Sequence, residues 1–568
     1  MKIKSKNRIA ACVVITFILM LMIASCSKDT LDEKPPHLLS SVNLYKSLAG
    51  FETGLNGLYA LARMEREGGN GGRMEVFMNG TDNLVVNSDV ADPEGFGQIM
   101  RFWGDRLNAQ DYAVRIHFEW LYSTVNAANT IIQAAEGNDV NWIGGGATPD
   151  ENRNRVIAEA RALRAWAYRH LTNCWGDVPL SLVESKGSTI KTDWVRTPVV
   201  DVRRQILSDL LYAEKCIPIE RTMRGRLTKG AVQHYLSEMY LYFDKPDSTL
   251  YWANKVINTP NYKLITARYG VRKNKPGVAV HDMWYEGNEN RDQGNTEALW
   301  VFQFAINAIG GGNPDGGWRR MHESRYANMV VDGVRPLQDT YERGGHGATR
   351  MSLTNWAISI YEPQDDRASQ YAMRKFYILN DAVANAPYDA DRLPPGYHYG
   401  DTIWCDWGKT VGVNEISPTN RINVARPFMR KVEGCDPNNP ASDGRQYNDQ
   451  VYLRLAETYL LKAEAEFRLG DPAAAAQTLN IIRRRSNARD ITASDVNIDF
   501  ILDERSRELV CEEDRRYTLI RVGKLVERAR KYNFNGGQFI TERDYLYPIP
   551  QAVIDANLTG VMPQNPGF

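Results

Sequence analysis

The stretch YLRLAETYLLKAEAEFRLGDPAAAAQTLNIIRRRS, residues 452–486, decides the fold of this chain. Apolar residues recur at helical spacing on both sides of a Gly470-Asp471-Pro472 turn. In such a turn glycine ends one helix, while aspartate caps the next and proline occupies its first position. Small residues stand where the two helices would approach each other: Ala456, Ala463 and Ala465. The stretch therefore predicts a helical hairpin with about the 34 residues of one tetratricopeptide repeat.

Helical periodicity extends outward from this hairpin in two blocks of sequence. A second hairpin, residues 228–243 and 247–258, is joined by Asp244-Lys245-Pro246. Further helices are expected at 44–67, 111–135, 154–173, 201–216, 449–469, 473–486 and 498–530. Residues 260–445 instead scatter Gly, Pro, Asn and aromatic residues, with strand-like runs at 298–304 and 373–379. We predict a mainly α fold, a single body over 41–568 whose helical frame (41–259 and 446–568) carries an irregular insertion (260–445) with short strands.

The N-terminus has the features of an export signal. A basic stretch (Lys2, Lys4, Lys6 and Arg8) precedes an apolar run over residues 9–23 that is short for a membrane span. Ala24-Ser25 then precedes Cys26, an arrangement that resembles a bacterial lipobox. We predict a lipoprotein signal peptide (1–25), lipidation at Cys26 and a polar tether (26–40). An ordinary signal peptide with an incidental cysteine, or an uncleaved anchor helix, remains the alternative.

The composition limits the partners and the cysteine chemistry. The chain has 69 basic and 69 acidic residues, so its charge gives no reason to expect nucleic acid as a partner. No cysteines have CxxC spacing, which disfavours a zinc site. Cys405 and Cys435 lie in loop-rich sequence and could pair, although we favour free thiols. Three cysteines in helical context are expected to be small core residues: Cys174, Cys216 and Cys511.

Five segments together resemble the SusD/RagB family of outer-membrane lipoproteins of Bacteroidetes. They are EARALRAWAYRHLTNCWGDVPL (159–180), GRLTKGAVQHYLSEMYLY (225–242), the stretch 452–486, ILDERSRELVCEEDRRYTLIRVGKL (501–525) and YLYPIPQAVIDANLTGVMPQNPGF (545–568). The resemblance covers nearly the whole mature chain in order. One departure is Cys511-Glu512-Glu513, where the family more often shows an aromatic residue.

This resemblance implies a frame of about four tetratricopeptide-like helix pairs and an irregular region that faces a ligand. It also implies a surface protein that binds an oligosaccharide or polysaccharide and acts as a lid on a SusC-like TonB-dependent transporter. The protein would be held at the outer membrane through its lipid and would carry out no catalysis. A peptide-binding lid of a TonB-dependent peptide transporter is the second hypothesis, and a glycan-degrading enzyme is the third.

The enzyme hypothesis depends on one acidic helix. Glu504, Glu508 and Glu512 are spaced by four and share a helix face, as a carboxylate pair for glycoside hydrolysis would require. Neighbouring arginines offer a plainer explanation, a salt-bridge face: Arg505, Arg507, Arg515 and Arg516. We therefore predict no enzyme and no cofactor. A structural Ca²⁺ in the Asp-rich loop 79–92 is the alternative, although the loop lacks the EF-hand order.

The ligand site is expected among aromatic residues in irregular sequence. A sugar ring stacks its C–H face on Trp or Tyr, while polar side chains bind its hydroxyls. Tryptophans within periodic segments are expected in the core: Trp120, Trp166, Trp252 and Trp300. The candidates for stacking are Trp103, Trp284, Tyr285, Trp318, Tyr326, Trp404 and Trp407. The polar candidates near them are Asp82, Asn83, Arg101, Asn313, Asp315, Arg319 and Arg320. The many loop tryptophans favour sugar over peptide.

Overall fold

A computed structural model describes most of the body of the chain. The described residues are 44–67, 75–86, 96–137, 139–221, 223–305, 308–312, 317–380, 390–405, 426–436 and 448–568. Cys26 and the rest of the predicted signal peptide and tether lie outside them. Within these ranges no helix is long and apolar enough to cross a membrane.

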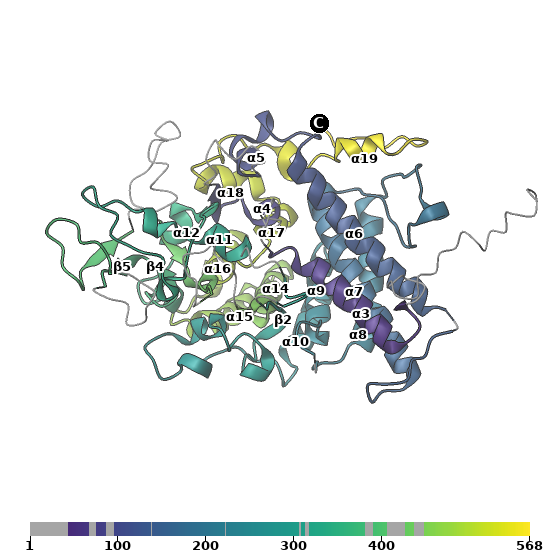
Figure 1. The fold of residues 1–568 in the computed structure, drawn as a ribbon, viewed down its shortest axis with the longest axis horizontal. Helices are drawn as coiled ribbons and strands as arrows, with labels where there is room; N and C mark the ends of the chain where they lie inside the picture. Colours follow the sequence, from purple (N-terminus) through teal and green to yellow (C-terminus); the bar gives the residue numbers. More distant parts are fainter. Residues whose placement is uncertain are drawn as a thin grey trace, which may run out of the picture.

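Helices dominate and pack against their neighbours in the sequence, as a tetratricopeptide-like frame requires (Figure 1). The frame helices are α3 (Leu48–Arg63), α6 (Tyr112–Ala135), α7 (Pro149–Trp175), α8 (Val199–Cys216), α9 (Lys229–Leu241), α10 (Pro246–Ile257), α14 (Leu455–Arg468), α15 (Pro472–Arg485) and α16 (Ile498–Leu509). Helix α10 of the first block packs on α14 of the second, so the two blocks form one continuous frame. The predicted fold class is confirmed.

The hairpin that opened the sequence analysis forms as predicted. Gly470 ends α14 with φ +82°, a conformation that glycine adopts without steric cost. The side chain of Asp471 caps α15 by accepting a hydrogen bond from the backbone N–H of Ala474 at 2.9 Å. Ala463 and Ala475 are fully buried in the apolar cluster between these helices. The small residues thus let the two helices approach closely.

The beginning of this hairpin was predicted wrongly. Residues 450–454 form strand β8 (Gln450–Arg454), and α14 begins only at Leu455. Strand β8 pairs antiparallel with β2 (Ala298–Phe302), which lies within the predicted strand 298–304. Every residue of β2 is buried. A strand that is buried on both faces has no alternation of apolar and polar residues, so its sequence does not indicate which strand it pairs with. The pairing joins the start of the insertion to the frame.

The long helix predicted over 498–530 is also wrong, because the segment forms three helices. They are α16, α17 (Arg515–Arg521) and α18 (Leu525–Tyr532). Cys511 has φ +69° and Gly523 has φ +70°, and both positions interrupt the helical hydrogen bonds. The first break frees the carbonyl of Cys511, which accepts a 2.6 Å hydrogen bond from the indole Nε1 of Trp318. A contact with the insertion therefore decides where α16 ends.

Short elements make up the remainder of the described chain. The small helices are α4 (Glu75–Met78), α5 (Phe96–Phe102), α11 (Gly317–His322), α12 (Asn355–Ser359) and α19 (Gln551–Asp555). Three two-stranded antiparallel sheets pair β1 (Leu84–Val86) with β3 (Met351–Leu353), β4 (Met373–Arg374) with β7 (Phe428–Met429), and β5 (Phe376–Ile378) with β6 (Thr402–Trp404). The strand predicted at 373–379 is thus confirmed, divided between β4 and β5.

A buried ion network fastens the insertion to the frame. Arg454 pairs with Glu297 at 2.7 Å and with Glu508 at 2.6 Å. Glu508 also binds Arg485 from α15 and Arg367 from the insertion. Related pairs join Lys431 to Glu512, Arg483 and Arg367 to Glu504, and Arg367 to Asp365. The carboxylates of α16 are therefore bound by cations that come from three distant segments.

Candidate functional site

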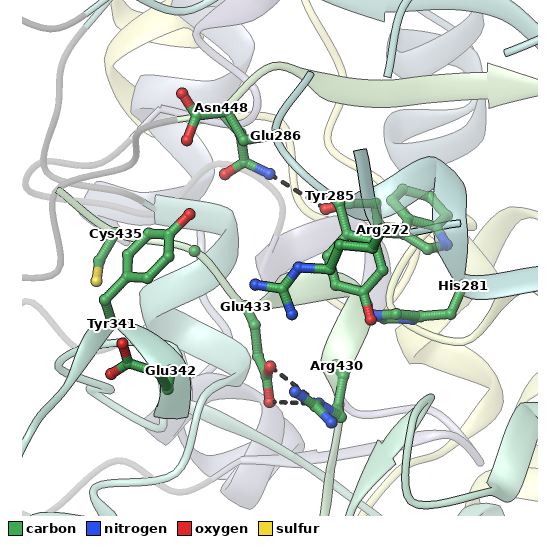
Figure 2. A pocket seen from close by; sticks show the side chains of 12 residues that line it. Arg272, His281, Tyr285, Glu286, Tyr341, Glu342, Arg430, Glu433, Cys435 and Asn448 are labelled. Carbon is green, nitrogen blue, oxygen red and sulfur yellow. Dashed lines mark hydrogen bonds and ion pairs between the residues drawn. The ribbon is translucent and has the colours of Figure 1, made fainter. Parts of the chain in front are cut away.

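Four short 3₁₀ helices of the insertion meet around one notch, shown in Figure 2. They are Gly270–Arg272, Ala279–Trp284, Tyr341–Arg343 and Arg430–Val432. The lining residues are Arg272, His281, Trp284, Tyr285, Glu286, Tyr341, Glu342, Arg430, Glu433, Gly434, Cys435 and Asn448. The depression spans about 470 Å³ including space open to solvent, and the centres of water molecules can occupy about 40 Å³ of it. Because one water needs about 10–15 Å³ of such space, the notch has room for a small group of a ligand, and the rest of the ligand would extend into the open part.

Aromatic side chains form two sides of the notch. Tyr285 and Tyr341 are both half-buried, so part of each ring remains accessible. The edge of His281 packs on Tyr285, with ring centroids 5.0 Å apart and planes at 84°. Trp284 is 6% exposed and lies deeper, 6.1 Å from the ring of Trp318. The accessible aromatic surface therefore belongs chiefly to the two tyrosines.

The charged side chains of the notch are unequally paired. Glu433 accepts hydrogen bonds from Arg430 at 2.9 Å and from Arg374 at 2.8 Å. The guanidinium of Arg272 lies 4.5 Å from the centre of the Tyr285 ring, and it makes no hydrogen bond or ion pair with any described residue. Burial lowers the pKa of His281 well below its usual value, and Arg430, Lys431 and Arg272 lower it further, so this imidazole is neutral. A positive field thus acts at the His281 end of the notch.

The floor of the notch is rigid and closely packed. Gly434 has φ +137°, and a Cβ there would lie 2.6 Å from Oδ1 of Asn448 and 2.8 Å from Nη2 of Arg319. Arg319 donates hydrogen bonds to that Asn448 oxygen and to the carbonyl of Val432. Cys435 and Cys405 are both free thiols, so the possible disulfide does not form. Glycine at 434 thereby lets the backbone lie directly on Arg319.

Of the predicted aromatic residues that the structure describes, Trp284 and Tyr285 line the notch. The structure corrects three others by burying them: Trp103 and Tyr326 are 0% exposed and Trp318 is 2% exposed. Tyr326 stacks on Tyr377 and donates a 2.7 Å hydrogen bond to the carbonyl of Gly345. These rings are not available to a ligand, because segments with few regular elements rely on their large aromatic residues to fill the core.

The predicted polar residues are also buried and already have structural roles. Asp82 accepts hydrogen bonds from Arg515 at 2.7 Å and from Arg528 at 2.7 Å. Asn83 is 2% exposed, and Arg101, 7% exposed, lies over Phe102. Arg319 lies beneath the notch floor, as described above. Because Arg515 binds both carboxylate oxygens of Asp82, this carboxylate is already engaged in an ion pair. Residues 87–92 of the loop considered for Ca²⁺ lie outside the described residues.

Trp404 stands apart from the other candidates. It is 63% exposed, at the end of strand β6, and its ring centroid lies 5.0 Å from that of Phe376 on the neighbouring strand. The pair offers an open aromatic surface on the β5–β6 hairpin. The remaining candidates Trp407, Asn313 and Asp315 lie outside the described residues, and so does the side chain of Arg320. The four tryptophans predicted in the core are all buried: Trp120, Trp166, Trp252 and Trp300.

Most of the notch residues were not predicted from the sequence, including Arg272, Tyr341, Glu342 and Asn448. One signal was present: a Tyr-Glu pair followed closely by glycine occurs at 285–287 and again at 341–344. Each pair sits where a 3₁₀ helix begins or ends, and each turns a tyrosine into the same notch. A search for repeated aromatic–acidic pairs in the insertion would have found both.

Three other depressions on the described surface differ from the notch. One, beside α10 and α15, has the exposed Lys263 but only one accessible ring, because Tyr459 is half-buried and Tyr262 is 2% exposed. The depression beside β2 contains several arginines, but each has an acidic partner: Arg221 with Glu159, Arg224 with Asp292, Arg226 with Glu159 and Arg291 with Glu220. The groove between α6 and α19 is lined mainly by apolar side chains, among them Phe118, Val553 and Met562. The notch is therefore the best candidate site for a polar ligand that also stacks.

The acidic face of α16 cannot work as a catalytic pair. Burial would raise the pKa of Glu504, but Arg367, Arg507 and Arg483 outweigh it and hold that pKa at about 2. Arg485, Arg454 and Arg367 similarly hold the pKa of Glu508 well below its usual range against the effect of burial. Glycoside hydrolysis needs one carboxylic acid with a raised pKa, and both of these groups are ionised. Among the described residues no group of three or more His, Cys, Asp or Glu side chains could hold a metal ion.

Comparison with known proteins gives consistent matches along the chain. Residues 296–568 match the family described as "SusD family", and residues 29–241 match the one described as "Starch-binding associating with outer membrane". The SusD-like protein P2 of Formosa agariphila is 25% identical over 574 residues, covering 98% of this chain and 99% of that protein.

Two solved structures have the same fold. A laminarin binding SusD-like protein superposes with a TM-score of 0.67 at 22% identity, covering 92% of this chain and 100% of that one. Surface glycan-binding protein A from Bacteroides thetaiotaomicron superposes with a TM-score of 0.65 at 17% identity, covering 92% and 100%. At these identities the structural matches establish the fold alone.

Proposed function

This chain belongs to the SusD family, and from that membership we propose that it captures an oligosaccharide or polysaccharide at the cell surface. The observation that carries the proposal is the notch, where two half-buried tyrosines lie beside Arg272, which has no carboxylate partner among the described residues. Relatives named for laminarin binding and surface glycan binding share the fold and support the same class of ligand.

The notch has the chemistry that a carbohydrate needs. Tyr285 and Tyr341 offer flat apolar rings for the C–H face of a sugar. Glu342 is exposed beside them and accepts hydrogen bonds from hydroxyls, while Arg272 donates them. Trp404 and Phe376 add a second aromatic surface on the β5–β6 hairpin, so a long chain would contact the protein at more than one place.

Delivery to a transporter is the further part of the proposal. The chain associates with the outer membrane, in keeping with its N-terminal family. Lipidation at Cys26 would hold the body there on the tether 26–40, since several acyl chains make a stable anchor. A SusC-like TonB-dependent transporter would then receive the glycan from the body, which would act as its lid.

Binding without catalysis is the mode of action that we propose. The ionised, arginine-bound carboxylates of α16 support this, because neither Glu504 nor Glu508 is able to donate a proton at neutral pH. Incubation of the purified protein with polysaccharides should release no reducing sugar. Reducing sugar produced in proportion to protein concentration would overturn this part of the proposal.

Isothermal titration calorimetry with a panel of oligosaccharides and short peptides tests the binding proposal. We expect saturable heat with a glycan and a loss of roughly 10-fold or more in affinity in Tyr285→Ala, because a stacked ring is lost. Tyr251→Ala is the matched control, since Tyr251 is 55% exposed on α10 and does not line the notch. Binding of peptides and of no glycan would favour the peptide-binding hypothesis instead.

A further inference from the structure

Arg272 is the unusual charge of the notch. Its guanidinium stacks on Tyr285 at 4.5 Å and points across the notch towards Tyr341 (Figure 2). Most of the half-buried and buried arginines of the chain bind a carboxylate or a carbonyl, as Arg268 binds Asp282 at 2.7 Å. Arg272 stands four residues further along the same segment with no such partner among the described residues. The stacking holds the plane of the guanidinium and leaves its N–H donors free.

The other cations near Arg272 each have a carboxylate partner. Arg430 and Arg374 share Glu433, and Lys431 binds Glu512 beneath the notch. His281 is neutral, as its burial and these cations require. Arg272 therefore contributes an uncompensated positive charge at this end, while the acidic side chains Glu286 and Glu342 line other parts of the notch. The notch thus has a place for an anion beside Arg272 and, apart from it, carboxylates that accept hydrogen bonds from hydroxyls.

We propose that Arg272 binds a negatively charged substituent, a carboxylate or a sulfate ester, and that the glycan captured by this notch is therefore acidic. This inference rests on the proposed glycan-binding function. The planar fork of a guanidinium matches the paired oxygens of either group. The ring itself would lie in the open part of the notch, between Tyr285 and Tyr341.

Two pairs of polymers test the inference by calorimetry at low and at physiological salt. One pair is oligogalacturonate and its carboxyl-reduced form, and the other is a sulfated galactan and its desulfated form. We expect one acidic form to bind roughly 10- to 100-fold more tightly than its neutral counterpart. Which pair shows the difference identifies the carboxylate or the sulfate as the substituent. Added salt should weaken the acidic form more than the neutral one.

The variants Arg272→Gln and Arg106→Gln complete the experiment. Arg272→Gln should abolish the preference for the acidic form and leave the affinity for the neutral form within about twofold. Arg106, exposed in the frame outside the notch, should give no change when replaced. Equal affinity for acidic and neutral glycans, or a preference that survives Arg272→Gln, would overturn the inference while the proposed function stands. Binding to no glycan of either kind would overturn both.

Discussion

Two neighbouring arginines at the end of α15 give the sharpest prediction about stability. The side chain of Arg485 is 0% exposed and pairs with Glu297 at 3.0 Å and with Glu508. The side chain of Arg484 is 64% exposed and pairs only with Asp490. Arg485→Met keeps much of the side-chain volume but leaves the buried network with one more negative than positive charge. Breaking a buried pair from one side costs about 3–5 kcal/mol, and we expect that loss in the free energy of unfolding.

Urea unfolding followed by circular dichroism measures this difference. Arg484→Met, the same substitution one residue earlier, should leave the midpoint nearly unchanged because exposed pairs contribute little. Adding Glu508→Gln to Arg485→Met should recover part of the loss, since the double variant restores the charge balance. Equal midpoints for the Arg484 and Arg485 variants, or strictly additive losses in the double variant, would refute the account of the network.

Acid should destabilise the fold through Glu504, whose pKa is held at about 2 against an ordinary 4.5. Ionised Glu504 contributes about 3 kcal/mol to the free energy of unfolding above pH ~4.5, and this contribution is lost as pH falls towards 2. Glu504→Gln should therefore flatten the dependence of the urea midpoint on pH in that window. An unchanged slope would contradict the assignment. Cys26→Ala should move the protein from the outer-membrane fraction to the soluble fraction on cell fractionation, because it removes the acyl anchor; a variant that stays membrane-bound would rule out lipidation at Cys26 as the anchor. Trp404→Ala should weaken binding of long glycans more than of short ones in affinity gels, since its exposed ring lies on the β5–β6 hairpin and not in the notch; an equal effect on both would refute a second contact surface.

The helical frame could be predicted well from the sequence because its signals are local. The turn at Gly470-Asp471-Pro472 combines a glycine with positive φ and an aspartate cap, and both act within a few residues. The errors arose where a distant segment decides the structure. Strand β8 exists because β2 pairs with it, and α16 ends where Trp318 binds the carbonyl of Cys511. Neither contact can be recognised from the hydrophobic pattern of the local sequence.

The candidate site was harder to predict, for a related reason. A tryptophan in irregular sequence either faces a ligand or fills the core, and the sequence alone does not separate these cases. Trp318 and Trp103 fill the core, whereas Trp404 is exposed. The notch depends on residues far apart in the sequence, such as Arg272 and Tyr341, that only the folded insertion brings together. The carboxylates of α16 were correctly assigned to salt bridges, but most of the predicted partners were wrong. Arg507 pairs with Glu504, whereas Arg505, Arg515 and Arg516 bind other groups. The remaining partners of the α16 carboxylates come from other segments.

A crystal structure of the protein with a bound oligosaccharide tests the central claim most directly. The account predicts electron density for a sugar ring against Tyr285 and Tyr341, with one substituent directed at the guanidinium of Arg272. Density for the ligand in another depression, such as the groove between α6 and α19, with the notch empty at saturating ligand, would contradict it.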